Sequence, residues 1–483
     1  MKRKHVLNLF RDHIPPSNLI TRPAAVKPFE TDGLTAIREV PWAVVLPETE
    51  EQVVDVLRIC RENGVPVVPR GAGTGLSGGA RPQRNGVVLG LSKMNRILEI
   101  DLDNCVAVVQ PGVRNLAISD AVSAHKLFYA PDPSSQIACS IGGNVAENAG
   151  GAHCLKYGVT VNNIVGLRVQ TITGECLALG GKRLDSPGMG LLAVLTGSEG
   201  MLGVVTEITV RLLPVPETRA VLLAAFDDVV SASEAVASII GGGLIPAALE
   251  MMDRLAIRGA EAYCCAGYPD CEAILICEVD GVAAEVAAAQ ELVQRVFEQN
   301  DALEVRIATD DKEQQRLWAG RKAAFPAMGR IASDYYCVDG TIPRRALPEV
   351  LVCIRSLGAE YGLAVANVFH AGDGNLHPMI LYDASFDGAV ERAEELGGKI
   401  LELCVTSGGT VTGEHGVGLE KIDQMCSQFS AAELSQFHRL KEAFDPVGLM
   451  NPGKAVPTLT RCVEVGGMHV HDGKLPYSAL ERF

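Results

Sequence analysis

The stretch of sequence that decides the fold of the first half reads Pro69-Arg70-Gly71-Ala72-Gly73-Thr74-Gly75-Leu76-Ser77-Gly78-Gly79-Ala80. Five of its twelve residues are glycine, so the backbone can take positive φ angles and bring its N–H groups close to a ligand. A Rossmann turn requires a helix directly after the glycines, whereas a polar turn over 81–86 and a strand-like run over 87–91 follow here. We therefore predict a strand–loop–strand cradle for a diphosphate, with Arg70 as its counter-charge. A flexible glycine loop without a ligand is the alternative interpretation of this loop taken alone.

Length and composition predict a two-domain protein that does not bind nucleic acid. The chain has 483 residues, of which 47% are hydrophobic and 21% charged, as in ordinary globular domains with sizeable cores. Its formal net charge of -15 repels nucleic acid and anionic lipid head groups. The basic start, residues 1–5, is not followed by the apolar run of a signal peptide, and no stretch is apolar enough to span a membrane. We expect a cytoplasmic protein, or one held at the inner membrane through partner subunits.

The 14 cysteines lack the spacing of a metal cluster or a disulfide framework. No C-x-x-C motif occurs, and only Cys264 and Cys265 are adjacent. For a cytoplasmic chain we expect scattered reduced thiols that pack as small hydrophobic side chains. If electrons leave through an iron–sulfur centre, that centre is expected on another subunit.

The first half alternates strand-like and helix-like segments. Thr49 followed by Gln52 is a capping-box signal, and apolar residues at helical spacing over 53–60 predict a helix that ends at Gly64. The remaining predictions are strands at 42–47, 65–68, 87–91, 106–109 and 204–213, a helix at 114–126, and a hairpin of 165–172 with 175–179. Pro214 and Pro216 stop the last strand, so we place the domain boundary there.

A second glycine-rich surface lies between residues 140 and 151. It reads Ser140-Ile141-Gly142-Gly143-Asn144 and then Asn148-Ala149-Gly150-Gly151. Glycine permits close backbone approach, and Ser and Asn supply hydrogen-bonding groups. Two such loops in one domain favour a ligand far more than one does.

The second half predicts a compact sheet covered by helices. Strands at 221–226, 248–252, 273–279 and 304–307 alternate with helical stretches, of which 283–299 and 390–407 are the clearest. A helical stretch at 318–328 carries Arg321 and Lys322, and Pro326 predicts a kink in it. A solvated surface charge is the ordinary interpretation of a cation at such a place.

Histidine and glutamate side chains gather in the segment 365–418. The segments 365–370 and 375–381 predict a hairpin; if His370 pairs with Asn375 across its turn, His377 lies diagonally from His370 on the same face. The glycine-rich segment 408–418 adds Glu414 and His415. Two histidines and a glutamate can hold zinc, manganese or iron with a position left open for substrate. A core histidine satisfied by backbone groups is the alternative for any one of them, but it explains the three together poorly.

The two glycine loops and Gly197-Ser198-Glu199-Gly200-Met201-Leu202-Gly203-Val204-Val205-Thr206 together resemble the FAD-binding domain of the vanillyl-alcohol oxidase and p-cresol methylhydroxylase (PCMH) flavoproteins. This resemblance implies that residues 1–216 form two α+β subdomains that hold an extended FAD. The implied cofactor contacts are Pro69, Arg70, Gly71, Ala72, Gly73, Thr74 and Gly75 at the pyrophosphate, Gly142, Gly143 and Asn144 near the isoalloxazine, Gly200, Val204 and Val205 on the adenosine side, and also Ser135, Asn148, Gly151 and Asn451. Some members carry a covalently attached flavin, so His153 is a candidate for such a link. A hydrogen-bonding histidine is the more ordinary interpretation.

The motif His-x-Gly-Asp-Gly-Asn-Leu-His at 370–377, with Gly-Glu-His-Gly at 413–416, resembles the C-terminal domain of the FAD-linked 2-hydroxyacid dehydrogenases. The resemblance implies an α/β cap domain over 217–457, with 431–457 packing back on the FAD domain and a tail over 458–483. It also implies a divalent metal held by His370, His377 and Glu414, with His415 as proton acceptor and Arg321 on the substrate carboxylate. Where some members that act on larger diacids have a lysine, this chain has Cys337, which favours a small monoacid.

The resemblance covers nearly the whole chain and is strongest to the glycolate-oxidising branch of that family. Its marks are the segments 321–327 and 334–345 and the C-terminal motifs at 468–471 and 480–483. Members of the branch work with a second FAD-domain subunit and an iron–sulfur subunit. The implied reaction is oxidation of glycolate to glyoxylate by hydride transfer to the flavin, with electrons passing on to a quinone-type acceptor. A single-subunit FAD-dependent D-lactate dehydrogenase, a metal-dependent hydrolase whose glycine loops hold a nucleotide, and a non-catalytic paralogue stay open.

Overall fold

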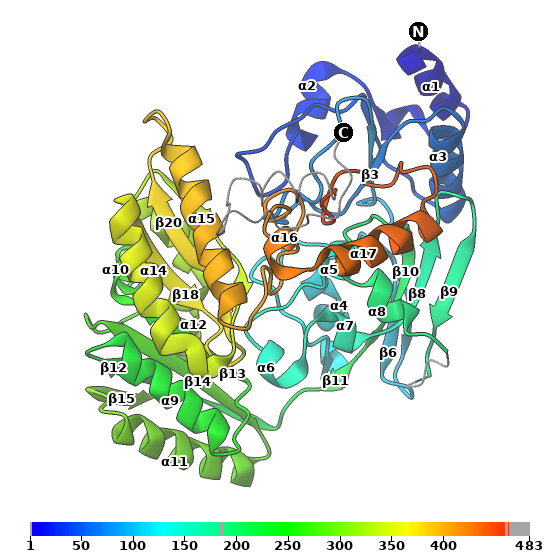
Figure 1. Cartoon of the computed structure of the whole chain (residues 1–483). Helices are drawn as coiled ribbons and strands as arrows, with labels where there is room; N and C mark the ends of the chain where they lie inside the picture. Colours follow the sequence, from blue (N-terminus) through cyan, green and yellow to red (C-terminus); the bar gives the residue numbers. More distant parts are fainter. Residues whose placement is uncertain (1, 184–187, 459–461, 463–483) are drawn as a thin grey trace. The chain divides into compact units, whose positions relative to one another are not determined.

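The computed structural model describes residues 2–183, 188–458 and 462, and the chain forms two compact units (Figure 1). Unit 1 comprises Met1–Ala149, Val159–Pro214 and His415–Phe483, and unit 2 comprises Gly150–Gly158 and Val215–Glu414. The predicted range 217–457 is therefore divided, because residues from His415 onward belong to unit 1. The C-terminal motifs at 468–471 and 480–483 lie outside the described residues.

A four-stranded sheet and its helices carry the first glycine loop of unit 1. The strands, in the order β1-β2-β4-β3, are β1 (Leu19–Ile20), β2 (Ala43–Val45), β4 (Val87–Gly90) and β3 (Val67–Arg70). Helices α1 (Lys2–Arg11) and α3 (Glu50–Glu62) pack on this sheet through a shared apolar core, and α2 (Pro23–Val26) lies between β1 and β2 in the chain. Thr49 caps α3 as predicted by accepting a hydrogen bond from the Gln52 N–H at 3.3 Å. The glycine loop thus leaves the end of β3 and leads to the parallel neighbour β4.

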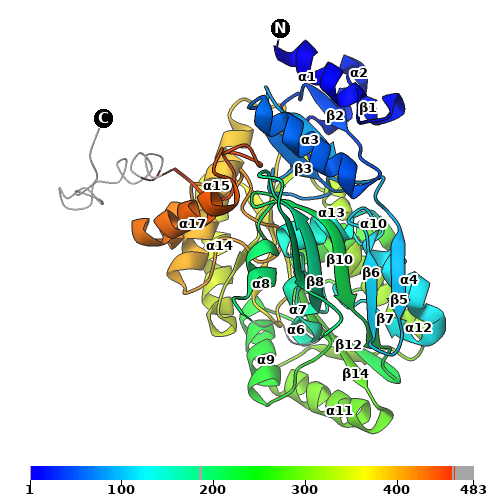
Figure 2. The same cartoon turned by 90° about the vertical axis from the view of Figure 1, so that its right-hand side faces the viewer.

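A five-stranded antiparallel sheet forms the second part of unit 1 (Figure 2). Its strands, in the order β5-β6-β10-β8-β9, are β5 (Ile97–Asp101), β6 (Val106–Val109), β10 (Val204–Arg211), β8 (Ile164–Gln170) and β9 (Cys176–Gly180). Short elements surround it: α4 (Asn115–Val122), β7 (Leu127–Phe128), α5 (Ile141–Glu147), α7 (Thr160–Asn163), α8 (Leu191–Leu195) and β11 (Leu213–Pro214). The hairpin prediction is confirmed by the pairing of β8 with β9.

Two predictions for this part of the chain were wrong in detail. The glycines of the second stretch were read as loop, but Gly142, Gly143 and Asn144 lie within helix α5. Ile141 and Val145 of this helix are buried in the core under the five-stranded sheet, so tertiary packing overrides the low helix propensity of glycine. The predicted helix 114–126 also ends early, at Val122, and a 3₁₀ turn follows it.

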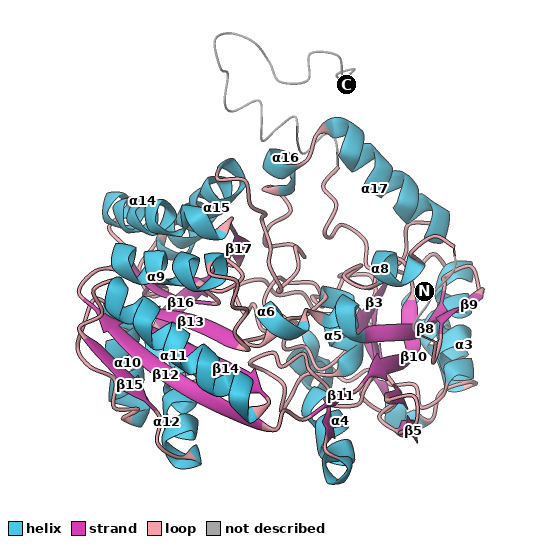
Figure 3. Ribbon diagram, turned by 90° about the horizontal axis from the view of Figure 1, so that it is seen from below, coloured by secondary structure: helices cyan, strands magenta, loops and turns pink. Residues whose placement is uncertain are grey.

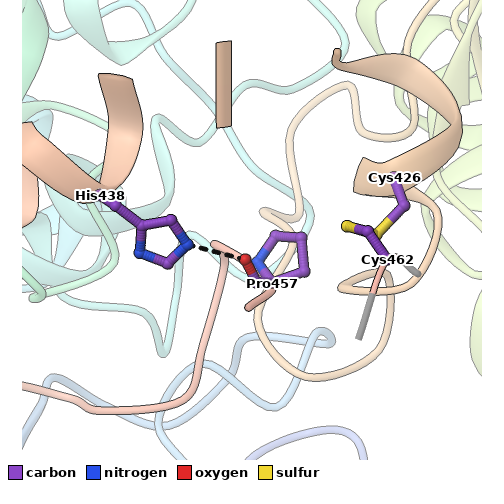
Figure 4. Close-up of a disulfide and its surroundings, with 4 residues drawn as sticks. All are labelled: Cys426, His438, Pro457 and Cys462. Atoms are coloured by element: carbon purple, nitrogen blue, oxygen red, sulfur yellow. Dashed lines mark hydrogen bonds between the residues drawn. A yellow bond between two sulfur atoms is a disulfide. The ribbon is translucent and has the colours of Figure 1, made fainter. Parts of the chain in front are cut away.

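The last segment of unit 1 contains a disulfide that the sequence spacing did not reveal. Cys426, in α16 (Met425–Gln428), is bonded to Cys462, 36 residues further on (Figure 4). Nearby, His438 of α17 (Ala431–Phe444) lies 2.9 Å from the Pro457 carbonyl oxygen (Figure 4). The expectation of reduced thiols was wrong for this pair, because the fold brings together cysteines that no short motif links. The other 12 cysteines, all within the described residues, form no disulfide.

Unit 2 is built on a seven-stranded antiparallel sheet. Its strands, in the order β15-β12-β14-β13-β18-β20-β16, are β15 (Glu304–Ile307), β12 (Thr218–Phe226), β14 (Ala273–Gly281), β13 (Ala248–Asp253), β18 (Ala364–Phe369), β20 (Pro378–Tyr382) and β16 (Asp334–Cys337). A separate pair joins β17 (Gly340–Thr341) to β19 (Asn375–Leu376). Successive residues of the long strands are buried, so side chains on both faces of the sheet are covered.

Helices cover the two faces of this sheet (Figure 3). One face carries α9 (Val229–Gly241), α11 (Ala283–Gln299), α14 (Leu347–Tyr361) and α15 (Ala389–Thr406), and the other carries α10 (Arg254–Cys264), α12 (Asp311–Lys322) and α13 (Ala324–Ala327), with α6 (Cys154–Tyr157) near β13. The predicted helix 318–328 is divided between α12 and α13, as expected near a proline such as Pro326. In the part of the chain that the structure describes, every helix is too short or too polar to cross a bilayer.

Candidate active site

Three predicted ligand side chains converge in unit 2. His370 Nε2 lies 3.3 Å from Glu414 Oε1, and His377 Nε2 lies 3.0 Å from the same oxygen. The two imidazole rings are 5.1 Å apart and nearly perpendicular. His370 and His377 are 6% and 1% exposed. This arrangement aims two ring nitrogens and a carboxylate oxygen at one place, with donor atoms within 4.8 Å of one another.

The hairpin turn sets the positions of the two histidines. His370 follows β18 and forms the predicted bridge to Asn375, its N–H donating to the Asn375 carbonyl at 3.0 Å. His377 lies between β19 and β20, two residues beyond that bridge. Because side chains two residues apart lie on one face of a strand, both rings point the same way. Gly413 borders the site, where a side chain would collide with Asn375.

Glu250 of β13 links the histidine pair to Arg321. Its carboxylate oxygens lie 2.8 and 3.0 Å from His370 Nδ1. Arg321 Nε donates to Glu250 Oε2 at 2.8 Å, and Arg321 Nη2 lies 2.6 Å from that oxygen. Arg321 and Glu250 are 3% and 1% exposed, so the default interpretation of Arg321 as a solvated surface charge was wrong. Sequence reasoning missed Glu250, although a lone carboxylate in an otherwise apolar strand is a usable signal.

Asp339 anchors the chain segment that carries Glu414. This fully buried carboxylate accepts hydrogen bonds from Thr412 Oγ1 at 2.7 Å, the Gly413 N–H at 3.1 Å and the Glu414 N–H at 3.2 Å. Its Oδ1 also lies 3.8 Å from His377 Nδ1. Asp339 was noted only as part of a motif, and its role as an anchor emerges from the structure. Cys337, two residues earlier, is buried and packs in the apolar core of unit 2.

Electrostatics favours an anionic Glu414. Burial by itself would raise the pKa of Glu414, but hydrogen bonds from His370 and His377 hold it well below its ordinary value. Burial likewise opposes charging of His370, yet the neighbouring Glu250 and Glu414 carboxylates raise its pKa well above the usual range. Glu250 is also kept anionic, since His370 and Arg321 outweigh burial and lower its pKa. The site therefore concentrates negative charge around two imidazoles, an environment that suits a cation.

The residue proposed as proton acceptor adjoins this group in sequence. His415 follows Glu414 and is the first residue of the last segment of unit 1. Its role as a base stays a prediction. Gly151, predicted to contact FAD, belongs to the short segment of unit 2.

His153, the residue considered for a covalent flavin link, lies in a polar cluster of unit 2. Its Nε2 lies 3.5 Å from Glu278 Oε1, and its ring is 5.6 Å from that of Trp318. Trp318 Nε1 donates to Glu278 Oε2 at 2.6 Å. These contacts give His153 a polar partner within its own unit, in agreement with the hydrogen-bonding interpretation.

The first glycine loop of unit 1 is folded around Arg70. Arg70 is 8% exposed, and its Nη1 donates to the Thr31 carbonyl at 2.7 Å, while its guanidinium lies 5.6 Å from the centre of the Phe29 ring. Gly73 has a φ of +77°, and any side chain there would collide with the guanidinium. Burial lowers the pKa of Arg70, although Asp32 opposes this. Arg70 thus braces the loop from within, and its service as a phosphate counter-charge stays a prediction.

The second predicted FAD segment lies directly beside this loop. Gly71 approaches the Ser140 side chain and the Gly143 backbone so closely that it leaves no room for a methyl group. Of the remaining predicted contacts, Asn144 accepts a hydrogen bond from Asn115 Nδ2 at 3.1 Å, and Asn148 ends α5 in a left-handed conformation. Gly200 packs against Pro69. The structure therefore brings together, within unit 1, the cofactor contacts predicted in the first glycine loop, in the stretch that forms α5, and at Gly200.

Val204, Val205 and Ser135 were also predicted to contact the cofactor. Val204 is buried in the apolar core beside the four-stranded sheet, and Val205 faces the opposite side of β10. Ser135 is half-buried, and its carbonyl accepts the N–H groups of Ala138 and Cys139 at 2.8 Å each. For these residues a cofactor contact stays a prediction.

A C-terminal clamp, defined here as Asn451 and Lys454, holds the far end of the glycine loop. Asn451 Nδ2 donates to the carbonyls of Gly79 at 2.9 Å and Glu199 at 2.6 Å. Lys454 Nζ donates to the carbonyls of Gly79 at 2.7 Å and Arg81 at 2.5 Å. Burial lowers the pKa of Lys454 to about 7. Asn451 ties together two segments of unit 1, and its contact with a cofactor stays a prediction. Lys454 was not predicted.

Polar atoms without partners mark the same region. In the described part of unit 1, Ser77 Oγ, Ser140 Oγ and Glu147 Oε2 are buried and have no hydrogen-bond partner. Such groups are costly unless a bound molecule satisfies them. All three border the glycine loop, because Ser77 belongs to it, Ser140 lies against Gly71 and the Glu147 carboxylate lies against Gly79. A ligand rich in hydroxyl and phosphate oxygens, such as FAD, fits these groups.

Comparison with known proteins identifies both halves of the chain. A model described as FAD binding domain matches residues 41–180, and one described as FAD linked oxidases, C-terminal domain, matches residues 215–455. The chain is 59% identical over 482 residues to glycolate oxidase subunit GlcD of Escherichia coli K12, covering 100% of this chain and 97% of that protein. It is 38% identical over 441 residues to the Bacillus subtilis GlcD subunit, covering 91% and 94%. It is also 33% identical over 436 residues to a D-lactate dehydrogenase of Archaeoglobus fulgidus, covering 89% and 95%.

Solved structures support the same assignment at the level of fold. p-Cresol methylhydroxylase with bound substrate matches with a TM-score of 0.79 at 19% identity, covering 95% of this chain and 98% of that one. An alkyldihydroxyacetonephosphate synthase matches with a TM-score of 0.73 at 19% identity, covering 93% and 85%. The predicted α+β architecture, a PCMH-type FAD-binding domain followed by an oxidase C-terminal domain, is confirmed. The chain therefore belongs to the FAD-linked oxidases.

Proposed function

We propose that this protein oxidises glycolate to glyoxylate, with FAD as the electron acceptor and a divalent metal at His370, His377 and Glu414. The observation that carries the proposal is the convergence of both histidine Nε2 atoms on Glu414 Oε1, within 3.3 Å. It occurs in a chain 59% identical to a glycolate oxidase subunit.

The chemistry of the donor set fits a resident metal. Two imidazoles and one carboxylate are common ligands of zinc, manganese and iron, and such a set leaves positions open for substrate. Glu250, on the far nitrogen of His370, is the kind of outer partner that orients a metal-binding histidine. A divalent ion held there supplies a Lewis acid for the substrate hydroxyl.

The remaining steps belong to side chains of this protein. We assign Arg321 to the substrate carboxylate, because its guanidinium is buried and fixed by Glu250 while it keeps further N–H groups to donate. We assign His415 as the base that takes the hydroxyl proton, since it directly follows the ligand Glu414. FAD supplies the acceptor for the α-hydrogen and its two electrons. Loss of one proton and one hydride converts glycolate to glyoxylate, so the atoms and charges balance.

The charges of the site favour a small acid with one carboxylate. Cys337 stands where some relatives that take diacids carry a lysine, so the site lacks that second cation. D-lactate is the nearest alternative, favoured by the 33% identity to a D-lactate dehydrogenase. Both acids share the carboxylate and the α-hydroxyl that the proposed residues recognise, and differ by one methyl group.

We also propose that the protein works within a complex. The GlcD relatives are named as subunits, and the described cysteines do not form a cluster-binding motif in this chain. An iron–sulfur subunit and a second FAD-domain subunit would then carry electrons from the reduced flavin to a quinone-type acceptor. Under this proposal the chain is cytoplasmic and peripheral to the inner membrane through those subunits.

Anaerobic titration of the full-length protein tests the proposed reaction. Glycolate, D-lactate and D-2-hydroxyglutarate are added in turn, and bleaching of the flavin absorbance is followed by stopped flow. We expect glycolate to reduce the flavin fastest and the diacid slowest. Faster reduction by D-lactate would assign the alternative substrate. A purified protein that takes up no flavin, yet hydrolyses a nucleotide, would replace the proposal with the hydrolase interpretation.

A further inference from the structure

The two faces of strands β13 and β18 border different sites. On one face lie Glu250 and His370, which belong to the candidate active site. Side chains alternate along a strand, so the next residues, Met251 and Phe369, face the opposite side. Those two residues pair across the strands and help to line a cavity of about 330 Å³. This cavity lies beside α14 in unit 2 and has no part in the proposed reaction.

The cavity has an apolar wall. Besides Met251 and Phe369, its lining includes Leu255, Leu351 and Leu363. Ligand sites in proteins begin at roughly 300 Å³, and this cavity reaches that size. The volume and the aliphatic lining together suit a small molecule with a branched or aromatic apolar group.

The lining of the cavity also includes polar side chains and both signs of charge. Asp253 and Arg355 are the charged residues of its lining. The Asp253 carboxylate is held in place by the N–H groups of Ala256 at 3.0 Å and Asn367 at 2.8 Å, and by Asn367 Nδ2 at 2.9 Å. Asn367 is 9% exposed, and its Oδ1 is buried without a hydrogen-bond partner. Asn367 Oδ1 is therefore an acceptor without a donor, in a lining that also holds an anion and a cation.

We propose that this cavity binds a zwitterionic α-amino acid with an apolar side chain, of the size of leucine. Its ammonium group donates to Asn367 Oδ1 beside Asp253, its carboxylate pairs with Arg355, and its side chain lies among the leucines. A plain fatty acid would leave Asn367 Oδ1 unsatisfied and bring an uncompensated anion near Asp253. A plain amine would not form the charge pair with Arg355, an exposed residue of α14. Only a molecule that carries both groups next to an apolar chain matches all three features.

Binding to the full-length protein tests the proposal without any need for enzymatic activity. L-leucine, isocaproate and isoamylamine share the branched chain but carry both charges, the carboxylate alone or the amine alone. Isothermal titration is expected to show saturable binding of L-leucine, and binding of each single-charge analogue weaker by about tenfold or more. No saturable binding of L-leucine at millimolar concentration, or equal binding of isocaproate, overturns the proposal.

Two variants, each with a matched control variant, locate the binding. Ala359, an exposed residue of α14 that lines the cavity, becomes a plug in Ala359→Phe, which is expected to abolish L-leucine binding. Ala288→Phe, at an exposed position of α11, is the matched control and is expected to bind normally. Arg355→Met is expected to weaken L-leucine binding by about tenfold or more, whereas Arg392→Met, at an exposed position of α15, is expected to bind normally. Unchanged binding in Ala359→Phe would place the leucine elsewhere and refute the site.

The outcome is independent of the proposed reaction. His377→Ala removes a proposed metal ligand on the other face of the sheet and is expected to leave L-leucine binding unchanged. Loss of glycolate oxidation in His377→Ala therefore neither supports nor contradicts ligand binding in the cavity. If His377→Ala loses L-leucine binding while Ala359→Phe still binds L-leucine normally, the leucine binds at the active site and the cavity proposal is overturned.

Discussion

Glu250 lies 2.8 Å from His370 Nδ1, and this contact decides which ring nitrogen of His370 faces Glu414. With Nδ1–H donating to Glu250, Nε2 is the nitrogen that faces Glu414, and it can serve as a metal ligand once it gives up its proton. The same carboxylate fixes Arg321. One buried side chain therefore orients both the proposed metal ligand and the proposed substrate-binding cation.

Replacing Glu250 by Gln is expected to weaken metal binding by about 10–100-fold, the usual effect of losing such an outer partner. The amide keeps the shape but presents an N–H group or a neutral oxygen, so Arg321 loses its charged partner and His370 loses the one at Nδ1. Metal titration of the metal-free protein, with metal content read by mass spectrometry, measures the change. Glu272→Gln, which alters a carboxylate paired with Arg254 at the surface, serves as control. Metal affinity unchanged in Glu250→Gln would show that the carboxylate does not orient the ligand.

His415→Ala is expected to stop flavin reduction by glycolate while leaving the flavin bound and visible. The variant removes the proposed base but none of the three proposed ligands. Anaerobic stopped-flow absorbance measures the reduction, and metal analysis of the same sample checks that the ion is retained. Bleaching at the normal rate would exclude His415 as the base.

The sequence predicted the local parts of the site and missed the distant ones. The hairpin turn at 371–374 allowed the pairing of His370 with Asn375 to be inferred, because turn length fixes register. Glu250 lies 120 residues before His370 in the chain. Rules based on sequence spacing relate residues of one element or one turn, so they could not predict this contact. Asp339 stood inside a recognised motif, yet its hydrogen bonds to the segment before Glu414 depend on tertiary packing.

The fold shows the same division between local and tertiary signals. Thr49 capped α3 as predicted, because capping is a property of a few neighbouring residues. Helix α5 was missed, because Gly142 and Gly143 disfavour a helix on their own and only the buried Ile141 and Val145 hold it in place.

Lys454→Met is expected to weaken FAD retention by about tenfold or more, because the variant removes hydrogen bonds to the carbonyls of Gly79 and Arg81 at the end of the glycine loop. The methionine keeps the volume and loses the donors, so the loop is less well ordered before the cofactor binds. Fluorescence of FAD released on dilution measures retention. Lys312→Met, at an exposed position of α12, is the matched control. Equal retention in both variants would show that the clamp is not needed for the cofactor.

Glu147→Gln is expected to flatten the dependence of stability on pH. Burial, and next the Glu199 carboxylate, raise the pKa of Glu147 well above its ordinary value of 4.5. The folded state therefore holds a proton that the unfolded state releases, so the stabilisation is complete below pH 4.5 and is lost as the pH rises towards the folded pKa. Glutamine mimics the protonated form at every pH. Urea unfolding at about pH 5 and about pH 8 should show a smaller loss in the variant than in the parent protein. The exposed Glu217→Gln serves as control. If the unfolding free energy falls equally between the two pH values in all three proteins, the pKa of Glu147 is not raised.

The disulfide between Cys426 and Cys462 is expected to stabilise the protein by about 4 kcal/mol, the loop-entropy value for a closure of 36 residues. The bond constrains the unfolded chain, so its loss lowers stability even though few contacts of the folded state change. Cys426→Ser is therefore expected to unfold at lower urea concentration than the parent protein, and a reductant should lower the stability of the parent but not of the variant. Cys353→Ser removes an exposed unpaired thiol and should behave as the parent does in both conditions. If the reductant destabilises Cys426→Ser as much as the parent, another thiol pair is responsible, and the bond between Cys426 and Cys462 does not carry the effect.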